Sequence, residues 1–457
     1  MNQFLDRKDF QLFSLGNTKY VFLTGSQQIF EITNPNMDAY FKMCIGEPVN
    51  KLLDDESIGK MTEILGRKQT IPEIQEKQKR LMLILNTTHG CNMACKYCFA
   101  STHHDRQNVM PLPIVRKSIC KMIERNPQAE QYSIYFFGGE PLLHKQFVEE
   151  AVEIAKEEII VNHRKKVNFL LNTNGTLIDD SISRFLAKEG FTVTVSIDGS
   201  ESANDINRVF LNGHGSFKRI IEGIDILKKH EVCFNLRATL HPKQKNLVDI
   251  FRFFEELRVS YSYAFTIAGG QDNTCETRFS DSDVDCLDNE WAKVMEYFWG
   301  KVLKRETIYC SDYLRKIQVL KMRKLRIRGC EAGHGTLFVD EKGTYYTCQN
   351  MLSFPETAVG SVNEGLNPDK LVKYRSKNLS QLSVCSECWA RYLCGGGCVA
   401  ERYCSDQSKN EYQQKCKIIQ LEWKHFICSY IQINQLINNK FNNQNHLDYG
   451  RFEKFRA

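Results

Sequence analysis

Six short apolar runs recur through the middle of the chain, each separated from the next by a stretch with amphipathic-helix spacing. The runs are rich in β-branched and aromatic residues, which favours strands, and they span residues 81–86, 132–137, 167–172, 192–197, 233–239 and 261–267. The helical stretches lie around residues 112–125, 144–162, 179–189, 216–230 and 246–257. This alternation predicts an α/β fold whose parallel sheet curls into a partial (β/α)6 barrel.

A smaller unit is predicted in front of the alternation. Short strands are expected over residues 10–16, 19–25 and 27–33, because each is apolar and bounded by turn residues. Asn36 is placed to cap a first helix, and a second helix is expected over residues 55–66. Together these elements predict a small winged-helix-like α+β domain, followed by a Lys-rich linker over residues 75–80.

Composition narrows the class of protein only slightly. The 457 residues predict two or three domains, and the apolar and charged contents, 42% and 25%, are those of ordinary globular proteins. A net charge of +6 argues only weakly for an anionic partner. The chain shows neither a signal peptide nor a run of eighteen apolar residues, so we expect a cytoplasmic protein without a membrane partner.

The 18 cysteines change this picture, because several stand at short, regular spacings. In a cytosolic chain such spacings indicate metal or redox chemistry rather than disulfides. Cys91, Cys95 and Cys98 follow the first run of the alternation as CxxxCxxC. Three thiolates can hold three irons of a 4Fe–4S cluster and leave the fourth iron open. A zinc loop is the alternative, although structural zinc normally takes four protein ligands.

Polar loops follow the next three predicted strands, where α/β folds build their active sites. They are Gly138-Gly139-Glu140-Pro141, Asn172-Thr173-Asn174-Gly175 and Ser196-Ile197-Asp198-Gly199, and Arg208 follows shortly after the third. Each is a common turn when taken alone. Their order at successive strand ends indicates one composite pocket.

The cysteine motif and these loops resemble the radical S-adenosylmethionine (SAM) superfamily over residues 81–430. The resemblance implies reductive cleavage of SAM to a 5′-deoxyadenosyl radical, which abstracts hydrogen from a substrate. The glycine loop would hold the SAM amino group, Asn174 and Ser196 would hold the ribose or carboxylate, and Arg208 would pair with the carboxylate, with Arg237 as the weaker candidate. The implied SAM pocket comprises Tyr97, Gly138, Gly139, Glu140, Asn174, Ser196, Asp198, Arg208 and Arg237.

Seven C-terminal cysteines resemble the SPASM extension, which holds two auxiliary 4Fe–4S clusters. The resemblance assigns Cys385, Cys388, Cys394 and Cys416 to a distal cluster. It assigns Cys330, Cys348 and Cys398 to a proximal cluster, whose fourth ligand stays open between Cys310, a substrate thiolate or none. Two zinc sites are the alternative. The expected cofactors are therefore three 4Fe–4S clusters and SAM.

The predicted layout is a recognition domain and linker over residues 1–80, the radical SAM partial barrel over 81–300, a SPASM domain over 301–430 and an Asn-rich tail over 431–457. Residues 301–328 carry ten Lys and Arg against two acids. This segment is either a groove for an acidic peptide or a solvated helix face, and RNA is less favoured.

The leading prediction is an enzyme that matures a ribosomally synthesised precursor peptide. SPASM enzymes typically act on peptides, and the N-terminal unit resembles a leader-recognition element, in which the leader adds a strand beside the third strand. We predict oxidative crosslinking through Cys thioethers, driven by an external one-electron reductant. No catalytic base is identified.

Three alternatives stay open. A sulfatase-maturating enzyme that makes formylglycine is expected to have an acid after the cysteine matching Cys348, where this chain has Gln349, and usually lacks the N-terminal domain. A carbon–carbon crosslinking or epimerising maturase is compatible with the same motifs. A non-catalytic iron–sulfur protein that binds peptide or RNA would not need the SAM loops.

Overall fold

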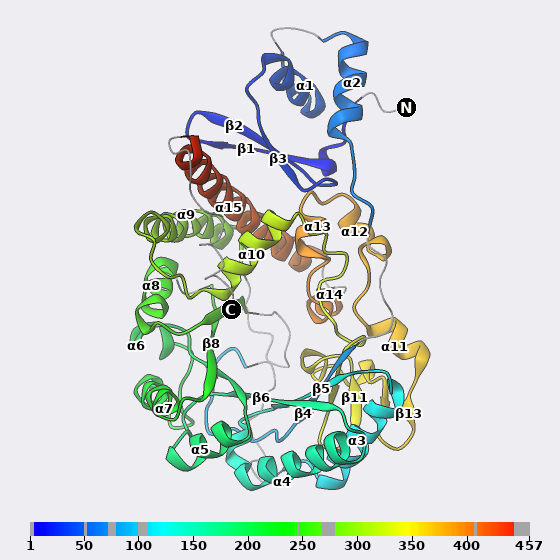
Figure 1. Cartoon of the computed structure of the whole chain (residues 1–457), viewed down its shortest axis with the longest axis vertical. Coiled ribbons are helices and arrows are strands. Elements are labelled where there is room, and N and C mark those ends of the chain that lie inside the picture. The colour runs from blue at the N-terminus through cyan, green and yellow to red at the C-terminus, as the bar shows by residue number, and fades with distance from the viewer. Residues whose placement is uncertain are drawn as a thin grey trace.

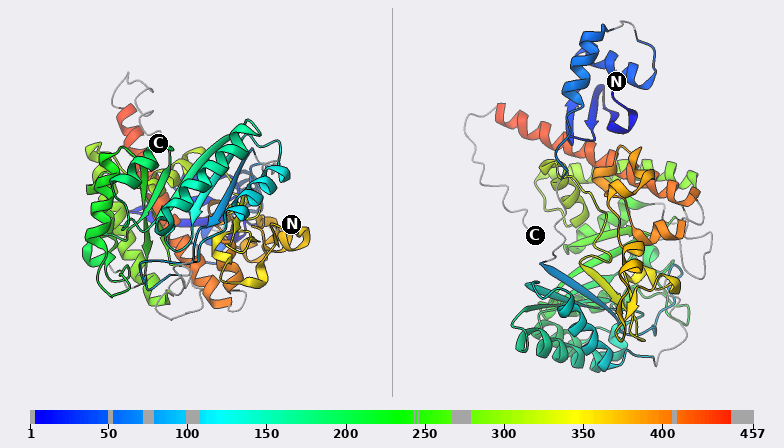
Figure 2. Two further views of the ribbon diagram at one scale, coloured as in Figure 1. Left: turned by 90° about the horizontal axis from the view of Figure 1, so that it is seen from below. Right: turned by 90° about the vertical axis from the view of Figure 1, so that its right-hand side faces the viewer.

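The structure is a computed structural model that describes residues 4–49, 53–71, 79–98, 108–242, 244, 246–266, 279–405 and 409–442. These residues form two sheets (Figure 1). The smaller sheet lies at one end of the molecule, beyond the long C-terminal helix, and the larger sheet lies at the other end (Figure 2). None of the described helices is long and apolar enough to cross a membrane.

The small N-terminal sheet forms from three antiparallel strands, as predicted. They are β1 (Phe10–Leu15), β2 (Thr18–Leu23) and β3 (Gln28–Glu31), followed by α1 (Pro35–Ile45) and α2 (Asp55–Leu65). Asn34 rather than Asn36 caps α1, because the Asn34 side chain accepts a hydrogen bond from the Asn36 amide and Pro35 fits the first turn. The predicted linker falls mostly outside the described residues.

Alternation along β2 gives the small sheet two buried faces. Val21 and Leu23 pack with Tyr40 and Phe41 of α1 in a separate small core. Phe13, Tyr20 and Phe22 belong instead to the main core of the protein. The sheet is therefore held between its own helices and the rest of the chain.

The six predicted strands of the central alternation are confirmed as neighbouring parallel strands. They are β4 (Arg80–Asn86), β5 (Gln131–Phe137), β6 (Lys166–Thr173), β7 (Thr192–Ser196), β8 (Cys233–Leu240) and β9 (Tyr261–Phe265). The helices between them are α3 (Leu112–Arg125), α4 (Lys145–Ala155), a π-helical turn (Lys156–Val161), α5 (Asp180–Lys188), α6 (Glu201–Asn204), α7 (Phe217–Lys229) and α8 (Leu247–Leu257). Their apolar faces are buried, as parallel sheets require.

The C-terminal region continues the same sheet, which the sequence did not predict. The added strands are β10 (Thr336–Val339), β11 (Thr344–Tyr346), β12 (Gly360–Ser361) and β13 (Gly365–Leu366). β10 pairs with β4 in parallel, and β11 to β13 follow in antiparallel order. The cysteine-rich region is thus joined directly to the first strand of the alternation.

Two predicted domain boundaries fall inside helices, and the division into domains stays a prediction. The boundary at residue 301 lies within α9 (Asp281–Lys304), and the boundary at residue 431 lies within α15 (Lys409–Asn442). α15 continues because Phe426, Ile427 and Ile431 are buried in the main core, where it packs on α9 and on α10 (Ser311–Met322). The C-terminal region also contains short helices, α11 (Pro368–Tyr374), α12 (Ser383–Ser386), α13 (Arg391–Cys394) and α14 (Val399–Ser405).

Candidate functional site

The first cysteine group lies in the loop after β4, and a second segment holds this loop in place. The Ala94 amide donates to the Val209 carbonyl at 2.8 Å and the Lys96 amide to the Asn207 carbonyl at 3.0 Å. Cys91 accepts hydrogen bonds at sulfur from the Met93 amide, at 3.4 Å, and from Nδ2 of Asn174, at 3.8 Å. Such bonds suit a thiolate that binds iron. The loop therefore fits a cluster.

Burial keeps these thiols protonated until a metal arrives. It raises the pKa of Cys91 and of Cys95 to about 12. Bound iron would supply the positive charge that the thiolates need, so loading of the site would release protons.

Gly138 and Gly139 allow the loop after β5 to lie directly against the segment that leads into Cys91. A Cβ on Gly139 would stand 2.0 Å from the Gly90 carbonyl oxygen, and one on Gly138 would stand 2.4 Å from the Thr88 carbonyl oxygen. Gly138 also has a φ of +136°. Both positions thus require glycine, because two backbone segments contact each other directly here, next to the cluster loop.

We expect Gly139→Ala to disturb the first cluster site. The new methyl group would clash with the backbone of Gly90, which cannot rotate away. The clash should cost about 1–3 kcal/mol in the free energy of unfolding. It would also displace Cys91, which is the next residue in the chain. Iron content and visible absorbance after anaerobic reconstitution should fall. Gly300→Ala in α9 is the matched control, because its Cβ meets nothing within 4 Å; equal iron loss in both variants would contradict the argument.

Glu140 is fully buried and joins the loops after β5 and β6. Its carboxylate accepts hydrogen bonds from the Leu142 amide at 3.0 Å, the Thr173 hydroxyl at 2.8 Å and the Asn174 amide at 2.7 Å. Burial raises the pKa of Glu140 to about 7 despite these donors. The side chain therefore positions its neighbours, while its predicted contact with the SAM amino group stays a prediction.

The side-chain amide of Asn174 is used within the same loops. Nδ2 donates to Oδ1 of Asn92 at 2.8 Å, and Oδ1 accepts from the Thr176 amide at 2.9 Å. Asn92 in turn donates to the Thr176 hydroxyl at 2.8 Å. The sequence did not single out Asn92 or Thr176, because a polar residue in a loop gives no signal of its partner. Their contacts lock the cysteine loop to the end of β6.

Asp198 forms a buried ion pair beneath the cysteine loop. Its Oδ2 lies 3.1 Å from Nε of Arg208 and accepts a short hydrogen bond from the Tyr97 hydroxyl. The guanidinium carbon of Arg208 stands 5.4 Å from the Tyr97 ring centroid, a cation–π geometry. Oδ1 accepts from the Thr239 amide at 2.9 Å. Asp198 therefore positions Tyr97 and Arg208. The sequence predicted all three residues as separate SAM contacts.

Arg208 stays charged in this setting. Burial alone would lower its pKa, but the Asp198 carboxylate outweighs burial and keeps the pKa raised. Its two terminal nitrogens have no hydrogen-bond partner among the described residues, so they remain available for an anionic group.

Ser196 and Arg237 lie on the face of the sheet opposite the helices. Cross-strand register aligns Ser196, Arg237 and Ser262 in one row, and Arg237 donates to the Ser262 hydroxyl at 3.2 Å. A second row consists of Asn172, Thr194 and Asn235. All six side chains retain solvent exposure, whereas a parallel sheet normally buries apolar residues on both faces. This polar face suits a bound polar molecule.

Electrostatic contacts link C-terminal cysteines in two sets, whose role as cluster ligands stays a prediction. Burial, followed by the nearby Cys394, Cys388 and Cys385, raises the pKa of Cys416 to about 12. The pKa of Cys398 is raised by burial, then by Glu401, and further by Cys348 and Cys330. No three His, Cys, Asp or Glu side chains of the described residues converge on a single ion position. The choice between two auxiliary clusters and two zinc sites therefore stays open, and the three-cluster count stays a proposal.

Glycines bring the two halves of the proximal group together. A Cβ on Gly329 would lie 2.2 Å from the Gly397 carbonyl oxygen, and one on Gly395 would lie 2.7 Å from the Arg328 carbonyl oxygen. These backbones touch because neither position carries a side chain, and the contact brings Cys330 to Cys398.

Cys310 is not placed to be the fourth proximal ligand. It is fully buried at the start of α10, where its amide donates to Glu255 at 3.1 Å. Burial, followed by Asp312 and Glu255, raises its pKa. Its backbone forms a bridge with Tyr261, the first residue of β9. The sequence around Cys310 is compatible with a loop or with a buried segment, so it could not show whether Cys310 is a cluster ligand.

The basic segment 301–328 does not form one continuous surface. Lys301 pairs with Glu255 at 2.7 Å, Lys316 pairs with Glu422, and Arg326 donates to the Gly329 carbonyl at 2.9 Å. All three are largely shielded from solvent. These three side chains are therefore neither part of a peptide groove nor part of a solvated helix face.

Comparison with known proteins agrees with the geometry of the loops. Residues 85–257 match the radical SAM superfamily. A cysteine-type anaerobic sulfatase-maturating enzyme of Clostridium perfringens is 33% identical over 180 residues, 38% of this chain and 48% of that enzyme. The chain thus spans about half the length of that relative. The radical SAM cyclopropyl synthase TigE of Paramaledivibacter caminithermalis is 26% identical over 350 residues, 72% of this chain and 69% of that protein.

Solved structures share the fold. Native anSMEcpe with bound AdoMet superposes with a TM-score of 0.64 at 20% identity, over 79% of this chain and 100% of that chain. Native anSMEcpe with bound AdoMet and Kp18Cys peptide gives a TM-score of 0.63 at 20% identity, over 79% of this chain and 99% of that chain.

Proposed function

Because residues 85–257 match the radical SAM superfamily, we propose that this protein is a radical SAM enzyme that oxidatively crosslinks a precursor peptide through Cys thioethers. The single observation that carries the proposal is that the small N-terminal sheet packs against the cysteine-rich region. Its β3 is an edge strand with Phe30 37% exposed. An edge strand with an exposed aromatic ring suits an added peptide strand.

The chain's own residues would bind, orient and shield the reactants. Cys91, Cys95 and Cys98 would hold the first cluster, and Arg208, set by Asp198, would face the SAM carboxylate. When bound, the cluster and SAM supply the one-electron chemistry that removes a hydrogen from an unactivated carbon. The polar face of β6 to β9 would receive SAM at Ser196 and Arg237 and the peptide segment beside it. Auxiliary clusters at the seven C-terminal cysteines would return the surplus electron or bind the substrate sulfur.

The direct test is mass spectrometry of small Cys-containing peptides encoded beside this gene and co-expressed with it anaerobically. One thioether removes one hydrogen from sulfur and one from carbon. SAM becomes methionine and 5′-deoxyadenosine, and one proton is released. We expect a loss of two hydrogens per site, with thiols that resist alkylation even after reduction. The same loss with free thiols would mean a carbon–carbon bond and overturn the thioether.

A sulfatase-maturating activity is the second candidate, because the Clostridium perfringens enzyme is the better match in identity. Gln349 follows Cys348 in place of the expected acid. An unmodified neighbouring peptide together with conversion of a sulfatase Cys to formylglycine would favour this candidate over ours.

We expect Cys388→Ala to separate SAM cleavage from product formation. The variant would keep the first cysteine group but lose a ligand of the distal cluster. Cleavage of SAM to 5′-deoxyadenosine should continue without peptide, while crosslinked peptide disappears. Both products are followed by liquid chromatography and mass spectrometry. Crosslinking at the parent rate would remove the distal cluster from the reaction.

A further inference from the structure

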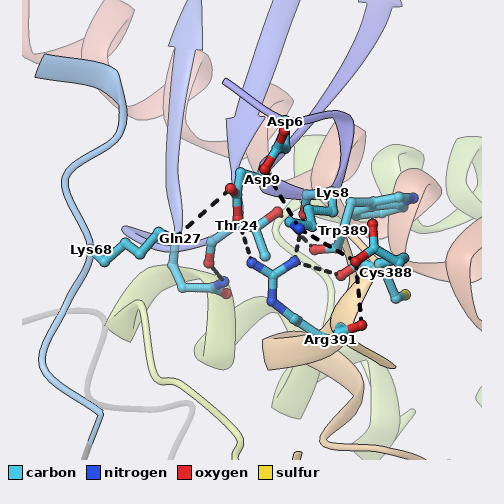
Figure 3. A network of polar contacts seen from close by, with 11 residues as sticks. Asp6, Lys8, Asp9, Thr24, Gln27, Lys68, Cys388, Trp389 and Arg391 are labelled. Carbon is cyan, nitrogen blue, oxygen red and sulfur yellow. Dashed lines mark hydrogen bonds and ion pairs between the residues drawn. The ribbon is translucent and has the colours of Figure 1, made fainter. Parts of the chain in front are cut away.

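The N-terminal unit is docked onto the loop that carries Cys388 (Figure 3). The Thr24 hydroxyl, just after β2, donates to the Trp389 carbonyl at 2.9 Å. The rings of Phe22 and Trp389 meet edge to face with centroids 6.0 Å apart. The interface therefore combines an apolar contact with a directed hydrogen bond. Both involve Trp389, which directly follows Cys388, a proposed ligand of the distal cluster.

Arg391 lies at the centre of this interface (Figure 3). Its Nη2 donates to Oδ1 of Asp9 at 2.5 Å, and its Nη1 donates to the Lys8 carbonyl at 2.5 Å and to the Cys388 carbonyl at 3.0 Å. The side chains of Arg391 and Asp9 are only 10% and 13% exposed, so their charge-assisted bond is shielded from water. One planar guanidinium thus binds the N-terminal unit and the Cys388 loop at the same time.

The opposite side of the same loop is held by α15. Nε2 of Gln420 donates to the Cys388 sulfur at 3.3 Å, and Nε2 of Gln435 donates to the Tyr20 hydroxyl of β2 at 2.7 Å. The Cys388 loop, α15 and the N-terminal sheet therefore contact one another in a closed arrangement. A shift of the N-terminal unit would remove its own contacts with the loop and the Gln435 contact with α15.

We propose that Arg391 is a positioning residue for the distal cluster site, and that the N-terminal unit, through Asp9, is a structural part of that site. This inference rests on the ligand role of Cys388 in the proposed function. The N-terminal unit then does more than recognise a peptide, because its docking sets the shape of the loop that holds Cys388. Partners that orient metal ligands in this way typically change metal affinity by about 10–100-fold.

The test compares the full-length holoprotein with Asp9→Asn. We expect a chelator to remove iron from the distal cluster at least about 10-fold faster, and the electron paramagnetic resonance signal of that reduced cluster to change, with the first cluster unaffected. Arg391→Lys keeps the positive charge but cannot bind Asp9 and the two carbonyl groups at the same time, so it should behave like Asp9→Asn. Asp38→Asn is the matched control, because Asp38 pairs with Lys19 and Lys42 in the same unit.

Hydrogen exchange in β1 and β2 shows whether the unit stays folded in each variant. If Asp9→Asn unfolds it, Thr24→Val, which removes only the bond to Trp389, should still accelerate iron release. Release at the parent rate in folded Asp9→Asn and Arg391→Lys would overturn the proposal. If Cys388→Ala loses iron while these two do not, the ligand proposal stands and only the positioning role fails. Parent iron content in Cys388→Ala would overturn both.

Discussion

We expect Cys91→Ala to abolish the formation of 5′-deoxyadenosine, which is one of the two largest effects that we predict. Two thiolates cannot hold the open-iron cluster, and groups that act as one unit lose more than about 10³-fold in rate when one is removed. Cys91 is also the cysteine that receives the Met93 and Asn174 hydrogen bonds. The measurement is SAM cleavage by reconstituted, reduced protein, followed by liquid chromatography.

Cys286→Ala is the control for this experiment, because it makes the same change at an exposed cysteine of α9. It should retain parent activity and iron content. Persistent 5′-deoxyadenosine in Cys91→Ala would show that the first cluster is assigned to the wrong residues.

Asp198→Asn should cost about 3–5 kcal/mol in the free energy of unfolding, because it leaves the charge of Arg208 buried without its partner. That is a large part of the total stability of a typical domain. The Tyr97 hydroxyl loses its charged acceptor at the same time, so SAM affinity should also fall. Denaturant unfolding and SAM titration measure the two effects separately.

Two comparisons isolate the buried ion pair. Asp288→Asn makes the same change at a half-exposed carboxylate that pairs with His425, and should cost at most about 1 kcal/mol. Asp198→Asn combined with Arg208→Met should recover much of the lost stability but not the SAM affinity. Parent-like stability of the single variant would show that Arg208 gains water or another partner when Asp198 is neutral.

The sequence predicted the central alternation well because its signals are local. Each strand from β4 to β9 is an apolar run bounded by polar loops, and each intervening helix carries its own buried stripe. For the same reason the sequence predicted that the three polar loops, residues 138–141, 172–175 and 196–199, follow successive strands. The π-helical turn Lys156–Val161 was predicted as plain helix, because its register change has no clear signature.

The contacts between distant segments could not be predicted. β10 is four residues long and pairs with β4 across most of the chain. Asp198 and Arg208, which the sequence predicted as separate SAM contacts, also pair with each other. Arg391 looked like an ordinary residue between cysteines, and only its contact with Asp9 gives it a role. Such partners depend on tertiary packing, which a single sequence does not encode as a pattern.

The place of β10 beside β4 has a consequence for the order in which the chain folds. During synthesis β4 emerges early, but the strand that covers its outer edge emerges only after some 250 further residues, since Asn86 and Glu341, which also bond across this edge, are 255 residues apart. Until then that edge exposes unpaired backbone groups, which promote association between chains. Pairings of such long range are also slow to form. Chaperones that cover this edge until β10 has emerged should therefore raise the yield of folded protein.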